Sequence, residues 1–384
     1  MFLLLHNNKI MKILHIHTSL QVGGIEALIA DLSNEMSKKH DVTVCTIFEP
    51  SNEDVFFRRL SEKIKKISCH KIEKGFSLKE ILSIYRVIKN GDYDIIHMHG
   101  FMHYYIFSII CMLKKTNFIY TVHNDAEKEN CKWDKRLFLL KKMIFKSKLV
   151  FPVTISEASQ SSFEKLYHVD NKMIYNGVSR VVDSGKKESL ISSLRITNDT
   201  LVFFHAGRIV EQKNQLVLCK VFKKLIEEGY DVTLIIAGDV HNVKTFRKIE
   251  PYFSDRIVYV GKRDDVIELI KESDAFCLSS IFEGMPISLI ESFSVGCIPI
   301  CSPVGGIVNM IIDNENGFLS RSPYEDDYYD CVKRFINSEE NQLRNIRIRA
   351  KKAFAEKYDI RISSKEYLNL YTEIIKKGYC KLGK

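Results

Sequence analysis

The sequence predicts an α/β protein made of two Rossmann-like, doubly wound domains with parallel sheets. Three observations carry this prediction. The chain has 384 residues, which is more than a single hydrophobic core usually serves. Short β-rich runs alternate with helical runs, as they do in βαβ units. This alternation stops in a polar stretch and then starts again, which predicts a second domain of the same kind.

The first domain is expected at residues 1–180. Short runs rich in β-branched and aromatic residues predict its strands at Lys12–His17, Val42–Ile47, Ile64–Ser68, Asp94–Met98, Phe118–Val122 and Leu149–Thr154. Helices are predicted between them at Ile25–Lys38, Leu78–Lys89 and Phe101–Leu113. The last helix falls short of the roughly 20 apolar residues that span a bilayer, so it is expected to be buried.

A polar linker is expected at residues 181–199 and the second domain at residues 200–358. Strands are predicted there at Val202–Ala206, Thr233–Ala237, Ile257–Val260, Ala275–Ser279 and Ile298–Ser302, and helices at Gln215–Glu228, Asp264–Lys271 and Ile287–Val295. Residues 359–384 are expected to form a C-terminal helix that crosses back to the first domain. Two such domains should face a central cleft, because ligands of doubly wound sheets bind beyond the carboxyl ends of the strands.

Composition narrows the functional classes. Ten cysteines without a C-x-x-C pair indicate reduced thiols in a cytosolic protein, not a disulfide framework or a zinc site. A net charge of +9 favours anionic partners without choosing among them. No helix-turn-helix, RNA-binding or finger pattern is present, so no nucleic acid partner is expected.

The segment Lys132–Lys148 is a basic helix whose apolar face is expected to include Trp133, Leu137, Leu140, Met143 and Ile144. Such a helix fits two roles. It can rest on an anionic membrane surface, or it can pack on the sheet and expose solvated lysines. The sequence leaves both open.

The most informative segment is Ile281–Gly296, which reads IFEGMPISLIESFSVG. Glu283 lies in a Gly/Pro loop, and Pro286 is expected to start a helix whose N-terminus attracts phosphate. Glu291 falls at the edge of the helix's apolar arc, where its carboxylate can accept hydrogen bonds from ribose hydroxyls. Taken alone, the segment fits an ordinary helical glutamate beside a Gly-Pro turn equally well.

Glycines and histidines also stand at predicted strand ends. Gly23 and Gly24 open a helix after the first strand, where backbone N–H groups can approach an anion closely. Neither G-x-G-x-x-G nor a P-loop occurs, which disfavours a dehydrogenase or a P-loop kinase. His123 ends the strand FIYTVH; a lone histidine is more often a structural hydrogen-bonding residue than a catalyst, but this position favours a functional role.

Arg208 and Lys213 follow the strand Val202–Ala206. At a junction between a strand and a helix, such a pair can neutralise a diphosphate, with arginine as a planar fork and lysine as a point charge. The alternative is a pair of ordinary surface cations.

The whole chain resembles glycosyltransferase family 4. The second half carries, in order, GRIVEQK, IIAGD, VYVGKRDDV, DAFCLSSIFEGMPISLIESFSVGCIPICSPVGGI and NGFL. The first half matches more loosely through VGGIE, DIIHMHG, YTVHN, PVTISEASQ and IYNGV. Asn214 departs from the pattern, since many relatives carry glycine there, and this change is expected to affect only the turn into the next helix.

The resemblance implies a GT-B fold and a retaining, metal-independent transfer of a hexose or N-acetylhexosamine from a nucleotide sugar, commonly a UDP-sugar. No cofactor and no metal are implied. The resemblance also implies donor-binding roles for Gly23, Gly24, Arg208, Lys213, Glu283, Gly284, Met285, Pro286, Ile287 and Glu291, and catalytic roles for His123 and Glu283. Within this set Arg208 and Lys213 hold the diphosphate, Glu283 touches the donor sugar, Glu291 binds the ribose, and His123 lies beside the hexose.

The family suggests that the acceptor attacks from the leaving-group face, whereas double displacement through a carboxylate stays open. The expected acceptor is a lipid-linked or polysaccharide precursor in surface glycan biosynthesis. The expected location is the cytoplasm, with peripheral attachment at the inner face of the plasma membrane as a further option. Two rival functions remain: a nucleotide-sugar epimerase of the same architecture, and a non-catalytic nucleotide-sugar-binding subunit of a polysaccharide assembly complex.

Overall fold

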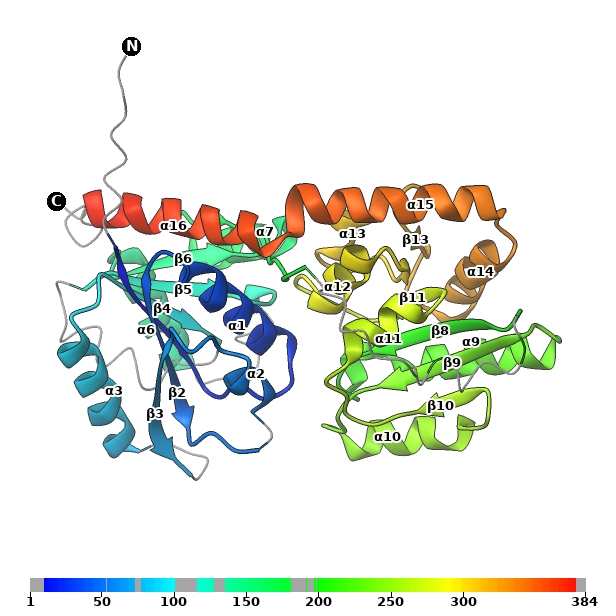
Figure 1. Cartoon of the computed structure of the whole chain (residues 1–384), viewed down its shortest axis with the longest axis horizontal. Coiled ribbons are helices and arrows are strands. Elements are labelled where there is room, and N and C mark those ends of the chain that lie inside the picture. Colours follow the sequence, from blue (N-terminus) through cyan, green and yellow to red (C-terminus); the bar gives the residue numbers. More distant parts are fainter. Residues whose placement is uncertain are drawn as a thin grey trace, which may run out of the picture. The chain divides into compact units, whose positions relative to one another are not determined.

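The computed structural model describes residues 10–52, 54–72, 77–100, 116–127, 135–180, 191, 197 and 199–377. It divides into two compact units, each of which is described by itself (Figure 1). Unit 1 comprises Met1–Ile155, Ser159–Ile174 and Ile360–Lys384, and unit 2 comprises Ser156–Ala158 and Tyr175–Asp359. The expected helix Phe101–Leu113, residues 1–9 and most of the expected linker 181–199 lie outside the described residues.

Unit 1 contains a sheet of seven parallel strands in the order β3-β2-β1-β4-β5-β6-β7. The strands are β1 (Lys12–His17), β2 (Asp41–Phe48), β3 (Lys65–Lys71), β4 (Ile95–His99), β5 (Phe118–Val122), β6 (Val150–Thr154) and β7 (Lys172–Met173). The helices are α1 (Gly24–Met36), α2 (Val55–Arg58), α3 (Leu78–Gly91), α6 (Lys135–Lys146), α7 (Glu157–Tyr167) and α16 (Ile360–Lys377).

The two faces of this sheet differ in chemistry, because successive side chains of a strand point to opposite sides. Leu14 and Ile16 of β1 belong to a hydrophobic core that also holds buried residues of α3, α6 and α7. The side chains of His15 and His17 alternate with them and carry polar groups to the other face. That face is covered by α16, whose Tyr371 contacts the strands.

Unit 2 contains six parallel strands in the order β10-β9-β8-β11-β12-β13. They are β8 (Leu201–Ala206), β9 (Val232–Ala237), β10 (Ile257–Tyr259), β11 (Ala275–Leu278), β12 (Ile298–Cys301) and β13 (Phe318–Leu319). The helices are α9 (Gln215–Glu227), α10 (Val243–Ile249), α11 (Val266–Glu272), α12 (Ile287–Val295), α13 (Ile307–Met310), α14 (Glu325–Ile336) and α15 (Glu340–Ala353), with short 3₁₀ turns at Glu211–Lys213 and Glu250–Tyr252 and a π turn at Phe354–Tyr358.

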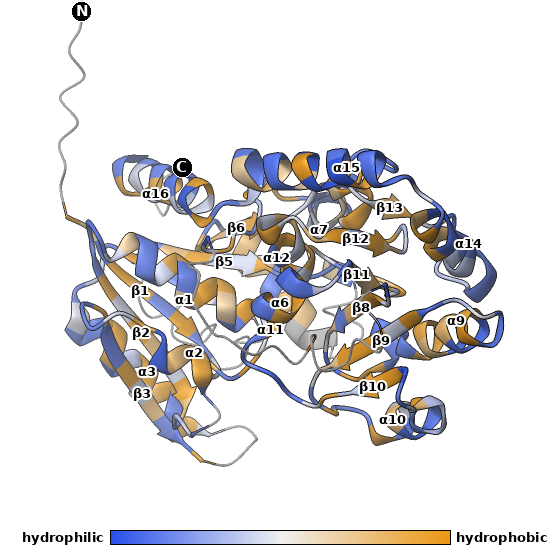
Figure 2. Cartoon of the chain, turned by 45° about the vertical axis from the view of Figure 1, so that its right-hand side comes forward, coloured by the Kyte–Doolittle hydropathy of each residue, from blue (hydrophilic) through white to orange (hydrophobic). Residues whose placement is uncertain are grey.

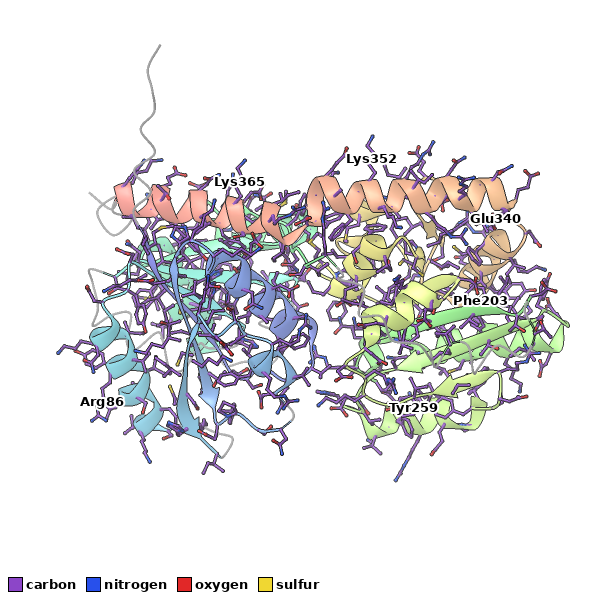
Figure 3. The ribbon with its side chains drawn as sticks, viewed as in Figure 1. Arg86, Phe203, Tyr259, Glu340, Lys352 and Lys365 are labelled. Carbon is purple, nitrogen blue, oxygen red and sulfur yellow. The ribbon has the colours of Figure 1, made fainter. Side chains whose placement is uncertain are left out.

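The core of unit 2 lies between its sheet and α9 and α14. Phe203 of β8 is fully buried and packs edge-on against Phe222 of α9, with 4.8 Å between the ring centroids. Figure 2 shows hydrophobic strands in both units, and Figure 3 shows Phe203 inside its unit while Lys352 of α15 and Lys365 of α16 point outward. The apolar sides of the helices therefore pack toward the core, and their charged sides face solvent.

The predicted strands and helices that the structure describes are confirmed. β1, β5 and α12 have the predicted bounds, while β3 extends further than predicted, to Lys71. The expected terminal helix is present as α16 and belongs to unit 1. The prediction named no helix at α14 or α15; α15 in particular is strongly basic and exposes much of its length, so its apolar stripe is narrow.

The cysteines that the structure describes are free and buried, in agreement with the expectation of reduced thiols. They are Cys45, Cys69, Cys219, Cys277, Cys297, Cys301 and Cys331. Within the described residues, no helix is both long and apolar enough to cross a membrane.

Helix α16 is attached to the sheet of unit 1 by buried polar contacts. The hydroxyl of Tyr371 lies 2.7 Å from Nδ1 of His97, and the hydroxyl of Tyr367 lies 3.1 Å from Oγ1 of Thr121. Nε2 of His97 lies 2.7 Å from the same Thr121 oxygen, so these four side chains of the sheet and helix form one network. Buried polar groups of this kind are costly when they lose a partner.

We predict that Tyr371→Phe destabilises unit 1 by about 1–3 kcal/mol, because it leaves Nδ1 of His97 buried without a partner. Urea unfolding followed by circular dichroism measures the change. The matched control is Tyr324→Phe, since Tyr324 is 75% exposed and its replacement should leave the midpoint unchanged. Equal midpoints for Tyr371→Phe and wild type would contradict the assigned role of this contact.

Candidate functional site

In each sheet the strand order reverses at one point, and ligands of doubly wound folds bind beyond the carboxyl ends of the strands at such a point. In unit 2 the reversal lies between the neighbouring strands β8 and β11. Gly207 and Arg208 directly follow β8, and the loop that carries Glu283 follows β11. The predicted residues of unit 2 therefore come together at the edge where a ligand is expected.

Lys213 and Glu283 form a largely buried ion pair. Nζ of Lys213 donates to Oε1 of Glu283 at 2.6 Å, and the side chains are 16% and 7% exposed. The hydroxyl of Ser280 donates to the same oxygen at 2.5 Å. Among the described residues, none donates a hydrogen bond to Oε2 of Glu283, so this oxygen is available to a ligand.

The backbone around this pair is joined by several hydrogen bonds. The N–H of Ile281 donates to the carbonyl of Gln212 at 2.8 Å, and the side-chain amide of Gln212 donates to the carbonyl of Phe282 at 2.9 Å. The hydroxyl of Ser279 donates to the carbonyl of Lys213 at 3.1 Å. The turn that carries Lys213 and the loop that carries Glu283 are thus held as one structure.

The turn after Lys213 accommodates Asn214 at a position where the family pattern has glycine. Its φ is 54°, in the left-handed region, which glycine adopts most easily and asparagine tolerates well. Its side-chain amide also donates to the carbonyls of Ser279 and Pro323, both at 3.2 Å. The asparagine therefore keeps the turn and adds contacts to the neighbouring loops.

Two glycines after β12 form the base of the Glu283 loop. A Cβ on Gly305 would lie 1.7 Å from the carbonyl oxygen of Glu283, and one on Gly306 would lie 2.0 Å from that of Gly284. Gly305 also has a φ of +53°. Only glycine fits at these positions, because any side chain would displace the backbone of the loop.

Arg208 differs from Lys213 in its surroundings. Its side chain is exposed, and within the described part of the chain its guanidinium forms no hydrogen bond and no ion pair. Its carbonyl accepts a hydrogen bond from the side chain of Gln215 at 2.9 Å, which fixes the backbone of Arg208 beside α9. The guanidinium is therefore a free cation on a fixed backbone.

Helix α12 follows the Glu283 loop. It begins at Ile287, as predicted, and Pro286 directly precedes it as the N-cap with an extended ψ of 123°. Met285 is buried and is held by Asn176, whose side-chain amide donates to its carbonyl at 3.3 Å. Glu291 is partly buried one turn into the helix, beside the fully buried Ile290.

In unit 1 the strand order reverses between β1 and β4. Gly23 caps α1, and Gly24 is its first residue, as expected. A Cβ on Gly23 would lie 2.2 Å from a carboxylate oxygen of Glu26, so this carboxylate occupies the space beside the glycine. Glu26 also lies 3.5 Å from Nε2 of His17.

His123 follows β5 and belongs to a cluster of buried histidines. Its Nε2 lies 3.2 Å from Nδ1 of His99, whose Nε2 lies 3.1 Å from Nδ1 of His15. Burial lowers the pKa of His15 and of His123 to about 3, and that of His99 well below its usual value. These imidazoles are therefore neutral at physiological pH.

Nitrogen atoms of His15, His97 and His99 lie close enough together to be considered as metal ligands. However, both ring nitrogens of His97 already take part in short contacts, with Tyr371 and Thr121 at 2.7 Å each. A metal would have to replace one of these contacts. Nε2 of His15, by contrast, is buried without a hydrogen-bond partner among the described residues.

The sequence missed several residues that shape the site. Gln212, Ser280, Gly305 and Gly306 were not predicted as site residues, although the structure places them around the Lys213 and Glu283 pair. Of these residues, the two glycines after β12 could have been recognised from the sequence, because they stand as a pair directly after a predicted strand. The hydrogen bonds of Gln212 and Ser280 depend on loop geometry and have no signal in a single sequence.

Comparison with known families covers both units. Residues 22–180 match the model described as Glycosyltransferase Family 4, and residues 186–353 match the model described as Glycosyl transferases group 1. The chain is 28% identical over 267 residues to UDP-Gal:alpha-D-GlcNAc-diphosphoundecaprenol alpha-1,3-galactosyltransferase of Escherichia coli, an alignment that covers 65% of this chain and 68% of that protein. It is 26% identical over 311 residues to the capsular polysaccharide biosynthesis glycosyltransferase CapH of Staphylococcus aureus, covering 77% and 82%.

Solved structures agree with the family match. A glycosyltransferase from Rickettsia africae superposes with a TM-score of 0.78 at 18% identity, covering 96% of this chain and 99% of that one. Anabaena HepE, in complex with UDP and glucose, superposes with a TM-score of 0.74 at 17% identity, covering 94% and 100%. These likenesses show the fold. The chain therefore has the GT-B fold. The family models that match its two halves show that it belongs to glycosyltransferase family 4.

Proposed function

We propose that this protein transfers a hexose or N-acetylhexosamine from a nucleotide sugar, in the first place a UDP-sugar, to a lipid-linked or polysaccharide-precursor acceptor. One observation carries the proposal: Arg208, the pair of Lys213 and Glu283, and the start of α12 lie together at the switch point of the unit 2 sheet. Cations and a helix N-terminus suit a diphosphate, and a neighbouring carboxylate suits sugar hydroxyls. The names of relatives that use a UDP-sugar or make a capsular polysaccharide support the same reaction class.

The donor diphosphate is assigned to Arg208 and Lys213. Arg208 has an unpaired guanidinium at the exposed edge of the sheet, which can bind two phosphate oxygens at once. Lys213 already carries a partner, so its ammonium is held in place before the ligand arrives. The N–H groups in the first turn of α12 add a positive end that favours the same anion.

Glu283 is assigned to the donor sugar. Its Oε1 is used by Lys213 and Ser280, which leaves Oε2 to accept a hydrogen bond from a sugar hydroxyl. Glu291, further along α12, is assigned to the ribose hydroxyls, as the family resemblance implies. The role of His123 beside the hexose rests on the same resemblance.

The transfer is proposed to retain the anomeric configuration and to need no metal. When the anomeric bond breaks, the leaving diphosphate gains negative charge, and fixed cations near it stabilise that charge in the transition state. Arg208, Lys213 and the start of α12 supply this stabilisation from the chain itself. Attack of the acceptor from the leaving-group face would give retention without a protein nucleophile.

A membrane-facing surface is proposed on α6, which supports a lipid-linked acceptor at the inner face of the plasma membrane. Leu140 and Ile144 of the expected apolar face pack toward the core, whereas Met143 is 66% exposed. Leu139, also exposed, precedes Met143 by one helical turn. Trp133 and the side chain of Leu137 lie outside the described residues.

Lysines flank these two exposed apolar side chains. Lys142 and Lys146 follow Leu139 and Met143 by three residues, so the four share one face of α6. Apolar groups surrounded by cations fit the surface of an anionic bilayer. In this proposal α6 has both roles that the sequence left open, because it packs on the core with one side and carries a basic apolar surface on the other.

The first test of the reaction uses Glu283→Gln. We expect this variant to keep UDP binding by calorimetry, because the amide oxygen of glutamine can still accept the hydrogen bond of Lys213. We expect it to lose nearly all sugar transfer, because the carboxylate of Glu283 is assigned to the donor sugar. Transfer is followed by mass spectrometry with UDP-sugars and undecaprenyl-diphosphate-linked sugars. Wild-type transfer rates in the variant would remove Glu283 from the mechanism. An epimer formed from the nucleotide sugar alone, observed by NMR, would instead indicate an epimerase.

A second test separates the two cations. Arg208→Ala is expected to weaken UDP binding by about 1.5–3 kcal/mol, the range for hydrogen bonds to charged groups, and to leave the melting temperature unchanged. Lys213→Ala should lower both quantities, because it also leaves the buried carboxylate of Glu283 without its cation. Calorimetry and thermal unfolding measure the two effects. Unchanged UDP affinity in Arg208→Ala would contradict its assignment.

The membrane surface is tested by flotation with vesicles. We expect binding to vesicles that contain anionic lipid, and the double variant Lys142→Gln, Lys146→Gln should weaken it by about 2 kcal/mol, at about 1 kcal/mol for each cation near the surface. Leu139→Gln should weaken it as well, whereas Ile348→Gln on α15, where Ile348 is 57% exposed, is the matched control. Equal flotation with neutral and anionic vesicles would leave α6 only its packing role.

A further inference from the structure

Two thiols of unit 1 lie in contact on neighbouring strands. Cys45 of β2 and Cys69 of β3 are 24 positions apart in the chain, and their sulfur atoms lie 3.8 Å from each other. A disulfide needs about 2.05 Å between its sulfurs, so a shift of roughly 2 Å brings the two atoms to bonding distance. Within the described ranges, no other two cysteine sulfurs make such a contact.

Strand β3 can make this approach because it is the edge strand of its sheet (Figure 1). Among the described strands, only β2 pairs with it. The ladder is also irregular beside the cysteines. Thr46 pairs with Ser68, but the next printed pair is Phe48 with Lys71, so β3 has one residue more than β2 there. A bulged edge strand is held by fewer ladder hydrogen bonds than a central strand, so it can shift toward its neighbour at lower cost.

The two thiols differ in their surroundings. Cys45 is fully buried, whereas Cys69 is 9% exposed. A thiolate costs more where it lies further from water, so we place the shared proton on Cys45. The hydrogen bond from Cys45 lowers the pKa of Cys69, against the effects of burial and of the Glu80 charge, and the pKa of Cys45 is raised well above its usual value. Cys69 is therefore the more nucleophilic of the two.

The carboxylate of Glu80 is itself paired. Its Oε2 lies 3.3 Å from Nζ of Lys71, and both side chains are largely buried. The ammonium of Lys71 therefore offsets the negative charge that Glu80 directs at Cys69. This pair keeps the neighbourhood of the thiol close to neutral.

We propose that Cys45 and Cys69 form an oxidation site at which a peroxide converts the two thiols into a disulfide between β2 and β3. In the first step the Cys69 thiolate attacks one oxygen of hydrogen peroxide, the O–O bond breaks, and the departing hydroxide takes a proton from solvent to become water. In the second step the sulfur of Cys45 attacks that of the Cys69 sulfenic acid. The S–O bond breaks, and the thiol proton leaves with the hydroxyl group as a second water. Two thiols thus give two electrons to one peroxide.

The bond would close the segment between the two cysteines, which supports the chain before Gly23. The N–H of Leu20 donates to Oδ1 of Asp54 at 2.9 Å, and the N–H of Phe56 donates to the carbonyl of Leu20 at 3.1 Å. Joining the ends of a segment restricts the unfolded chain and so stabilises the folded one. In a reducing compartment such a bond forms transiently, as in redox-sensing proteins.

The first test treats the reduced full chain with hydrogen peroxide under native conditions, followed by alkylation and mass spectrometry. We expect a loss of two hydrogens that a dithiol reductant reverses. Digestion with trypsin should then give one cross-linked pair, residues 40–58 with residues 67–71, which carry Cys45 and Cys69. Absence of this cross-link in the folded protein would overturn the proposal. So would a cross-link that forms only in urea, because it would belong to the unfolded chain.

Three variants test the order of the two steps. Cys45→Ala removes the second thiol, so Cys69 should stop at the sulfenic acid, gain one oxygen and be trapped by dimedone. Cys69→Ala should leave Cys45 reduced at the same peroxide dose, because a buried, protonated thiol reacts slowly. Cys219→Ala is the matched control, since Cys219 is fully buried in unit 2 with a pKa raised to about 12, and its removal should leave the cross-link unchanged. Oxidation of Cys45 in Cys69→Ala at the wild-type rate would overturn the assignment of Cys69 as the attacking thiol.

The effect on the fold is measured by urea unfolding, followed by circular dichroism. The cross-linked protein should unfold at a higher urea concentration than the reduced protein. Peroxide should leave the midpoint of Cys45→Ala without this rise, which separates the disulfide from oxidation elsewhere in the chain. An equal or lower midpoint in the cross-linked wild type would contradict a bond that the folded sheet accommodates. None of these measurements depends on transferase activity.

Discussion

The contact between the Lys213 ammonium and the Glu283 carboxylate is the interaction on which the unit 2 site depends. Taking two charges out of water is costly, and their attraction offsets that cost only when further hydrogen bonds complete the arrangement. Here Ser280 supplies one of them. Gln212 and the glycines after β12 hold the backbone on both sides of the pair. The pair therefore contributes less to the stability of unit 2 than to holding the side chains around it in fixed positions.

Both units place polar side chains at the carboxyl edge of a parallel sheet, but these side chains differ in their chemistry. In unit 2 the carboxyl edge of the sheet carries cations and a carboxylate, whereas in unit 1 it carries buried imidazoles whose pKa values are lowered by burial. Burial explains the difference, because an imidazole can give up its charge when it loses water. Lys213 and Glu283 instead form an ion pair with each other. Each arrangement fixes the direction in which a polar group can meet a ligand.

The strands were predictable from the sequence because their signals are local, and the candidate residues of unit 2 were named from equally local patterns. Runs of β-branched residues gave β1 and β5, and the Gly-Pro loop identified Glu283 before α12. The contacts of Gln212 with Phe282, and of Gly305 with Glu283, join segments far apart in the chain, so one sequence does not reveal them. The sequence identified His123 singly, whereas the repeated H-x-H of β1 and β4 already placed further histidines on one face of the sheet.

The return of α16 to unit 1 has a consequence for biosynthesis. His97 and Tyr371 are separated by 274 positions, so the ribosome has to synthesise all of unit 2 before this partner of the first sheet exists. Nascent domains generally fold as units during translation. Here the earlier unit has to wait with one polar face uncovered while the later one can already be complete. The contacts of His97 with Tyr371 therefore form only after both units have been synthesised.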